Sequence, residues 1–326
     1  MNVLGDPPVI AIIGAGEMGA AVGRRLREAG ARVLISLSGR SAASVDRVRR
    51  AGLKGINDDQ RLTDGVDCIL SIVPPAAALE VAERLSTQLR NAASPPPFAD
   101  CNAISPTTMH RIERLLDPLP VIDAGIIGGP PLSGSQDPSA GPRFYASGPH
   151  AHRLAALTRY GLDIVVMDAP IGAASGLKLA YAGLTKGFTA LAAAIITAAS
   201  RDGLAEALRI ELRRSQPQFL DRIDRLVPAI FPKAYRWVAE MEQIAEFIAD
   251  PAAGATIYEG AARLYEAVAA DLAAGQPQGR FISLTHFRRA SSSLSRTLLT
   301  PFVWTTPPNR AKNKLGKILA GSSSQD

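Results

Sequence analysis

Two lysines interrupt an apolar stretch near the middle of the chain. Lys178 and Lys186 lie within residues 175–199, where the other side chains are almost all small or apolar. A lysine in an apolar helix can simply extend its ammonium group to water. A desolvated lysine instead has a lowered pKa and can exchange a proton near neutral pH. Lys178 is therefore a candidate general acid/base, and a solvated charge is the alternative for Lys186.

A glycine pattern near the N-terminus could hold a dinucleotide. It follows the apolar segment 9–13, opens a predicted helix and is followed by a second apolar segment, 33–37. In such a loop the glycines allow a tight turn, a close approach to a pyrophosphate, and close packing of helix on strand. The predicted cofactor contacts in this loop are Gly14, Gly16, Glu17, Met18 and Gly19.

The end of the second apolar segment discriminates between NAD and NADP. An acidic residue at this position would accept hydrogen bonds from the ribose 2′-hydroxyl and repel a 2′-phosphate. The chain has no acid here and instead offers Arg40 and Ser41, which suit a phosphate dianion. The sequence therefore favours NADP over NAD, and an ordinary exposed charge is the alternative for Arg40.

The elements that must position these residues follow a βαβ order. Short apolar segments alternate with helical or polar stretches up to residue 171, which indicates a doubly wound, mostly parallel sheet of the Rossmann type. Beyond it the strand signals stop, and an all-α region follows. The predicted strands are 9–13, 33–37, 68–73, 98–101, 121–124, 144–146 and 164–167. The predicted parts are a cofactor domain at 1–171, a helical domain at 172–283 and a basic, disordered tail at 284–326.

Four segments between residues 8 and 190 can be compared with known families. They are Gly14-Ala15-Gly16-Glu17-Met18-Gly19, Asp100-Cys101-Asn102-Ala103-Ile104-Ser105-Pro106, Asp123-Ala124-Gly125-Ile126-Ile127-Gly128-Gly129, and Gly172 with Lys178. In this order and spacing they resemble the β-hydroxyacid dehydrogenases, which include 3-hydroxyisobutyrate and 6-phosphogluconate dehydrogenases. Segment 235–245 resembles a less characterised, phosphogluconate dehydrogenase-like branch with a divergent C-terminal domain.

The resemblance implies a function and a set of site residues. It implies an NADP-dependent oxidoreductase that transfers hydride between nicotinamide and a β-hydroxy acid or related carbonyl compound, with Lys178 as the acid/base. Further cofactor contacts would be Val73, Pro74 and Asn102. Substrate contacts would be Asn102, Gly128, Gly129, Tyr181 and Lys186. The helical domain of this family often packs against a second subunit, so a homodimer is expected.

Two positions depart from the family pattern. The family commonly has serine where this chain has Ile127 and asparagine where it has Ala182. Both changes remove polar groups that would grip a small hydroxy acid, so substrate recognition must differ. An imine reductase is one alternative, although that group usually lacks the lysine. A catalytically silent NADP-binding sensor or scaffold is another.

Composition narrows the classes of partner. Of the net charge of +6, residues 280–326 contribute eight basic residues against one acid, or +7, which leaves −1 for the rest. The basic character thus belongs to the tail, and no nucleic-acid module is visible.

Because the N-terminus lacks a secretory pattern and the most apolar window, 188–199, is too short to span a bilayer, we expect a cytoplasmic protein without membrane contact. Four scattered histidines lack metal-ligand spacing, so no metal site is predicted.

Overall fold

The computed structural model describes residues 5–58, 60–134, 137–249 and 252–274, so the predicted tail at 284–326 lies outside the described residues. The first part is an eight-stranded sheet in the order β3-β2-β1-β4-β5-β6-β7-β8. All neighbouring strands are parallel except β6 and β7, which pair antiparallel. The strands are β1 Val9–Ile13, β2 Arg32–Ser36, β3 Lys54–Ile56, β4 Cys68–Ser71, β5 Phe98–Asp100, β6 Val121–Ile127, β7 Arg143–Ser147 and β8 Asp163–Val166.

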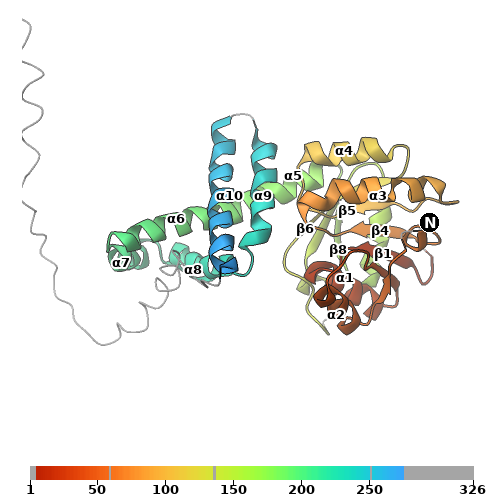
Figure 1. The fold of residues 1–326 in the computed structure, drawn as a ribbon, viewed down its shortest axis with the longest axis horizontal. Coiled ribbons are helices and arrows are strands. Elements are labelled where there is room, and N and C mark those ends of the chain that lie inside the picture. The colour runs from red at the N-terminus through yellow and green to blue at the C-terminus, as the bar shows by residue number, and fades with distance from the viewer. Residues whose placement is uncertain (1–4, 59, 135–136, 250–251, 275–326) are drawn as a thin grey trace, which may run out of the picture. The chain divides into compact units, whose positions relative to one another are not determined.

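Helices cover both faces of this sheet (Figure 1). Ile10 and Ile12 of β1 belong to a core packed against α1 and the 3₁₀ helix η4, whereas Ala11 and Ile13 belong to a second core packed against α3 and α4. Strands buried on both faces are typical of a doubly wound sheet. The helices are α1 Glu17–Glu28, α2 Ala42–Arg50, α3 Ala78–Asn91, α4 Pro106–Leu116 and η4 Ala151–Tyr160.

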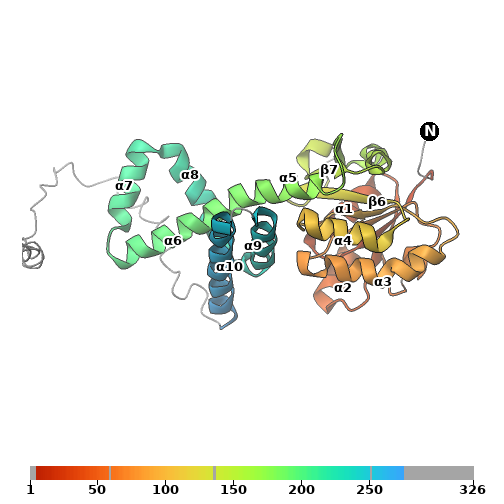
Figure 2. The ribbon, with the colours of Figure 1, turned by 90° about the horizontal axis from the view of Figure 1, so that it is seen from above.

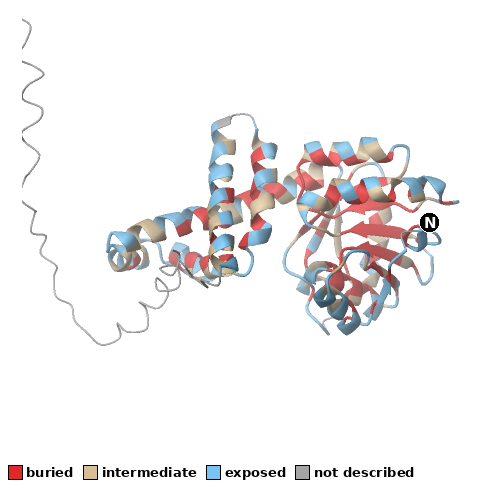
Figure 3. Ribbon diagram, viewed as in Figure 1, coloured by how far each residue is buried: buried red, intermediate tan, exposed pale blue. Residues whose placement is uncertain are grey.

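The described chain after β8 consists of helices joined by short turns. It contains α5 Ala173–Ala182, α6 Phe188–Arg201, α7 Ala205–Ser215, α8 Pro217–Leu226, α9 Ala234–Ile248 and α10 Ala252–Ala273. A third core lies here, and the buried Tyr265 and Trp237 in it meet edge to face with ring centroids 5.1 Å apart. Buried positions on these helices alternate with exposed ones (Figure 3). The predicted fold class, a Rossmann-type sheet followed by an all-α region, is confirmed.

Helices α5 and α6 form one continuous helix through the π-helical segment η5, Gly183–Gly187 (Figure 2). The sequence indicated a short apolar helix at 188–199. The observed helix, Ala173–Arg201, has 29 residues and is long and apolar enough to cross a membrane by length and composition alone. The prediction that this segment is too short was wrong, because α5, η5 and α6 share one axis. Of its most apolar window, 44% is buried inside the protein.

Candidate functional site

The glycine loop joins β1 to α1 and leaves an open place in front of the helix. Gly14 has φ 143°, and a Cβ there would stand 2.0 Å from the carbonyl oxygen of Ile72. A Cβ at Gly19 would come equally close to the carbonyl oxygen of Gly14, at 2.0 Å. Both glycines are therefore required by the close packing of the turn. A Cβ at Gly16, in contrast, would meet no atom within 4 Å. The space before the N-terminus of α1 is free for an anion such as a pyrophosphate.

The residues between these glycines face different surroundings. Glu17 begins α1, and its carboxylate lies 3.7 Å from the guanidinium of Arg236 on α9. Met18 is half-buried and packs against the core beneath α1. The predicted loop thus lies between the sheet and the helical region.

Unpartnered polar groups gather at the end of β2. The hydroxyl of Ser36 is fully buried, and the buried Nε of Arg40 follows it in the next turn. Neither atom has a hydrogen-bond partner among the described residues. Ser41 accepts a hydrogen bond from the backbone N–H of Ser44 and so begins α2. Because buried polar groups are normally paired, the end of β2 fits a ligand that brings its own acceptors.

Arg47 is a residue of this region that sequence reasoning missed. Its Nη1 donates a hydrogen bond of 3.0 Å to the carbonyl of Ala15, so α2 is tied directly to the glycine loop. Arg47 follows Arg40 by seven residues on a helix rich in arginine, and nothing in the sequence distinguishes it from its neighbours.

Asn102 fastens the ends of two neighbouring strands. Its Oδ1 accepts a hydrogen bond of 2.6 Å from the N–H of Val73, and its Nδ2 donates to Ser71 and Asp100 at 3.2 and 2.7 Å. The side chain is 3% exposed. Asn102 therefore shapes the wall between β4 and β5, and direct contact with cofactor or substrate stays a prediction. Pro74 follows Val73 and precedes the 3₁₀ turn η2, Pro75–Ala77.

A buried carboxylate beside this wall holds the start of α5. Asp123 on β6 accepts hydrogen bonds from the hydroxyl and N–H of Ser175 at 2.5 and 3.1 Å, and from the hydroxyl of Ser147 at 2.9 Å. The Ser147 hydroxyl in turn accepts from the N–H of Ala174 at 3.0 Å. Burial raises the pKa of Asp123, and these hydrogen bonds from Ser175 and Ser147 oppose the rise. The first turn of α5 is thereby fixed to β6 and β7.

Lys178 follows Ser175 by three residues and points to the end of β6. Its Nζ donates a hydrogen bond to the carbonyl of Ile126. Burial lowers the pKa of Lys178 to about 8. The close approach of α5 to β6 requires a glycine at position 125, because a Cβ there would stand 2.7 Å from the carbonyl oxygen of Ala174 and 3.1 Å from Cβ of Lys178. The structure therefore supplies a buried amine that can change protonation near neutral pH.

The predicted substrate glycines come directly after β6 in the chain. Gly128 has φ 127°, Gly129 has no atom within 4 Å of a built Cβ, and both are exposed. They lie two and three residues beyond Ile126, the acceptor for Lys178. On the helix side, Tyr181 lies one turn beyond Lys178 and is 52% exposed. Lys178 and the two glycines are thereby brought to one end of β6.

The second lysine is placed by the π-helical segment. In a regular α-helix, a residue eight positions after Lys178 would be rotated about the helix axis by about 80° from it. One π turn takes up one extra residue, so the rotation between the two positions becomes about −20°. Lys186 lies inside this segment, so it returns to the face that carries Lys178. Burial lowers the pKa of Lys186, and the nearby positive charges of Lys178, Arg236 and Lys233 act in the same direction.

Three side chains hold Lys186 in place. Its ammonium group contacts the carboxylate of Glu240 and lies 5.6 Å from the ring centroid of Trp237. Its carbonyl oxygen accepts a hydrogen bond of 2.6 Å from the hydroxyl of Tyr265. Lys186 is therefore an ordered, largely buried side chain paired with Glu240, and not a solvated charge.

Helix α9 carries further polar contacts to the cofactor domain. Gln243 accepts a hydrogen bond of 2.8 Å from the N–H of Ser105, and Glu246 accepts one of 2.8 Å from the Ser105 hydroxyl. Ser105 is the N-cap of α4 and is fully buried. Together with Arg236 and Glu240, these residues form a polar row along α9 that meets the glycine loop, Lys186 and α4.

Comparison with known proteins agrees with this arrangement. Residues 9–151 match a family model described as the NAD binding domain of 6-phosphogluconate dehydrogenase, and residues 199–268 match a domain of unknown function. An uncharacterized 28.5 kDa protein in the 7S RNA 5′ region of Methanothermus fervidus is 26% identical over 240 residues, or 73% of this chain and 90% of that protein.

Solved structures show the same architecture. A conserved protein of unknown function, described as structurally similar to 3-hydroxyacid dehydrogenases, has a TM-score of 0.59 and 29% identity over 82% of this chain and 99% of its own. The 3-hydroxyisobutyrate dehydrogenase of Mycobacterium tuberculosis, solved with L-serine, has a TM-score of 0.60 and 20% identity over 86% and 99%, and shares the fold. With the dinucleotide-binding match at residues 9–151 in front of a divergent helical region, the predicted resemblance to the 6-phosphogluconate dehydrogenase-like, β-hydroxyacid dehydrogenase family is confirmed.

Proposed function

We propose that this protein is an NADP-dependent oxidoreductase that transfers hydride between the nicotinamide and a β-hydroxy acid or the matching carbonyl compound. The observation that carries the proposal is the place of Lys178. Its buried amine is held against the carbonyl of Ile126 at the end of β6, beside the exposed Gly128 and Gly129.

Lys178 would manage the proton of the reacting oxygen. In oxidation the neutral amine takes the proton of the substrate hydroxyl at Nζ, and in reduction the ammonium returns it. A pKa of about 8 allows both forms near neutral pH. When bound, the nicotinamide accepts or supplies the hydride, so the protein needs no other redox group. The Asp123 network keeps α5, and with it the amine, in a fixed position.

The substrate carboxylate would meet the backbone of Gly128 and Gly129. With Ile127 and Ala182 in place of the usual serine and asparagine, fewer polar side chains are available there. Lys186 lies on the same face of the helix as Lys178, and we propose that it interacts with the anionic end of the substrate. The pair with Glu240 would hold it ready for that contact.

The choice of NADP rests on the end of β2. The free hydroxyl of Ser36 and the free Nε of Arg40 are donors without acceptors, which a 2′-phosphate would supply. An acidic side chain, which would favour NAD, is missing from residues 36–41.

We further propose that the protein forms a homodimer through the outer side of α5 and α6. Leu184, Leu191 and Ile195 are 75%, 64% and 54% exposed, and no charged residue lies between Phe188 and Ser200. Exposed apolar patches of this kind mark interaction sites, and a second copy presents the same patch across a twofold axis.

The test of the function is a screen of purified protein for NADP reduction and NADPH oxidation. The panel contains β-hydroxy acids, the matching carbonyl compounds and cyclic imines. Turnover of a hydroxy acid or its carbonyl partner supports the proposal. Turnover of imines alone would favour an imine reductase, and tight NADPH binding without any turnover would favour a silent sensor or scaffold.

A further inference from the structure

A buried arginine lies at the C-terminal end of α1, away from the residues discussed above. Arg25 is 4% exposed, and its Nη1 donates hydrogen bonds of 3.1 and 3.4 Å to the carbonyls of Asp137 and Gly161. Gly161 has φ 83°, and a Cβ there would stand 3.0 Å from Cδ of Arg25. The guanidinium is therefore held in one orientation by backbone that leaves room for its stem.

The other edge of the guanidinium is free. Nε and Nη2 of Arg25 are both buried and have no hydrogen-bond partner among the described residues. These two parallel N–H groups form the edge that binds carboxylate or phosphate oxygens bidentately. A buried charge with an unpaired edge is strongly unfavourable, so the edge needs an acceptor.

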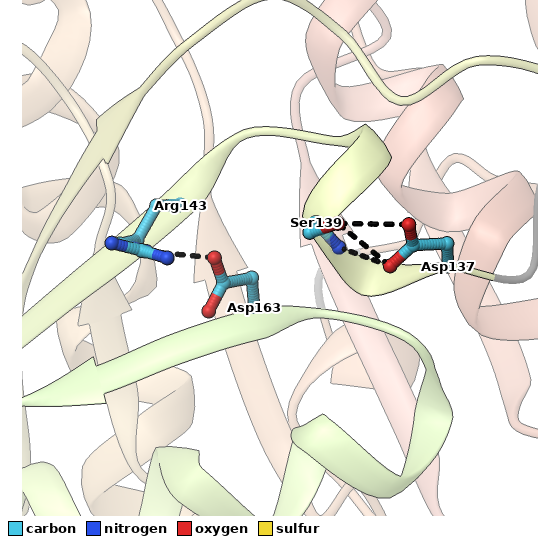
Figure 4. A network of polar contacts seen from close by, with 4 residues as sticks. All are labelled: Asp137, Ser139, Arg143 and Asp163. Carbon is cyan, nitrogen blue, oxygen red and sulfur yellow. Dashed lines mark hydrogen bonds and ion pairs between the residues drawn. The ribbon is translucent and has the colours of Figure 1, made fainter.

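The carboxylates of Asp137 and Glu28 lie near Arg25 but have other partners. The carboxylate of Asp137 accepts hydrogen bonds from the N–H and hydroxyl of Ser139 at 2.9 and 2.8 Å (Figure 4). Ser139 lowers the pKa of Asp137, and the charge of Arg25 adds to this only through space. The carboxylate of Glu28 lies 4.0 Å from Arg24 and 3.7 Å from Arg27, and its side chain is 31% exposed.

A cavity lies at the same place. It has a volume of about 140 Å³ and is lined by Arg25, Glu28, Pro138, Thr158, Arg159 and Gly161. Since about 10–15 Å³ of accessible volume is enough for one water molecule, the cavity has room for a small oxyanion and several waters. Two arginines and one glutamate lie in its lining.

We propose that this cavity binds a small oxyanion, a carboxylate or a phosphate, on the Nε–Nη2 edge of Arg25. The site is separate from the hydride chemistry and does not depend on it. The site is linked to the β6–β7 connection, because Arg24 and Arg25 donate hydrogen bonds to the carbonyls of Pro131 and Asp137 within it. That connection begins at Gly128 and Gly129, so a bound anion would steady the hydrogen bond of Arg25 to Asp137, beyond the candidate substrate glycines.

The experiment is thermal unfolding of the full chain in saturating NADPH, which occupies the cofactor site. Sodium acetate and sodium phosphate are titrated against sodium chloride at equal ionic strength. We expect a saturable rise in Tm of about several degrees with at least one oxyanion. If only acetate raises the Tm, the ligand of the cavity is a carboxylate. If only phosphate raises it, the ligand is a tetrahedral oxyanion. A rise no greater than that in chloride would overturn the proposal.

Variants locate the effect. Arg25→Gln should weaken the anion response at least about tenfold. Arg49→Gln, on the exposed side of α2, should leave it unchanged. An equal response in Arg25→Gln and wild type would contradict the assignment.

Glu28→Gln decides the question if Arg25→Gln does not fold. Removal of this negative charge from the cavity lining should tighten anion binding several-fold. If Glu28 itself turned onto the free edge of Arg25, oxyanions would stabilise Glu28→Gln and leave the wild type unaffected. That result would overturn the proposal.

Discussion

The carboxylate of Asp123 accepts a hydrogen bond of 2.5 Å from the hydroxyl of Ser175, three residues before Lys178 on the same helix. A strand of the sheet is thereby joined to the first turn of the helix that carries the candidate acid/base. The hydrogen bonds of Asp123 run to Ser175 and Ser147, so it acts as a positioning residue for α5.

Asp123→Asn should reduce turnover and leave cofactor binding intact. The amide cannot accept all the hydrogen bonds that the carboxylate accepts, so α5 would lose its fixed starting point. We expect kcat to fall at least about tenfold, since small misplacements of a catalytic group are costly. NADPH titration by fluorescence should give a nearly unchanged Kd. Ser175→Ala, which removes one of these bonds, should have a smaller effect, and a full effect on Kd instead of kcat would count against this role.

Lys178→Met should lower kcat by at least about a hundredfold, because it removes the proton donor and acceptor but keeps the apolar stem. In the wild type, oxidation should become faster as pH rises through about 8, since the neutral amine is the base. Reduction should become slower over the same range. Lys186→Met is the matched control, and it should raise KM more than it lowers kcat. Near-normal turnover of Lys178→Met would leave the proposed mechanism without its central group.

Arg40→Ala should weaken NADPH binding about tenfold or more, because a charge-assisted contact contributes about 1.5–3 kcal/mol. NADH lacks the 2′-phosphate, so its Kd should hardly change. Both cofactors can be titrated by fluorescence with the same protein. Equal weakening of the two would show that Arg40 does not read the phosphate.

Asp100 should make the protein less stable as pH rises from about 4 to 7. Burial raises the pKa of Asp100 to about 7, against opposing hydrogen bonds from Asn102. An unfolded aspartate has a pKa of about 3.9, so within this window the folded state holds a proton that the unfolded state has released. Urea unfolding at pH 5 and 7.5 should show the loss, about 1 kcal/mol or more. Asp100→Asn should flatten the dependence, whereas the exposed Asp46→Asn should not.

Leu191→Glu with Ile195→Glu should convert the proposed dimer to a monomer, because it places two charges in the apolar contact of α6. Light scattering coupled to gel filtration measures the mass directly. Ile257→Glu is a matched control, since Ile257 is 67% exposed on α10. A wild type that is already monomeric at micromolar concentration would refute the dimer.

Much of the sheet could be predicted from the sequence, because its strands are apolar runs between turns. The prediction for β1 was confirmed with the same bounds, Val9–Ile13. Strand β3 was missed because Lys54-Gly55-Ile56 is short and has only one apolar side chain of any size. Its pairing with β2 comes from tertiary context and leaves no periodic signal.

The site was predictable in its residue types and less so in their contacts. The positions of Lys178 and the glycines follow from motif spacing. The use of the Asn102 amide between two strands, the reach of Arg47 to the glycine loop and the role of Asp123 depend on side chains far apart in the chain. No single segment of the sequence contains that information.

The π-helical segment at Gly183–Gly187 governs what a change of length would do to this protein. Because the π turn takes up one extra residue, deleting one residue within it would leave a regular α-helix in which Lys186 stands seven positions after Lys178, again rotated by about −20° from it. The two lysines would stay on one face of the helix. A second deleted residue would instead turn everything beyond it by about 100° relative to α5. This helix can therefore lose one residue at the π turn without a change of facing, whereas the loss of two is a rotation of one half of the enzyme against the other.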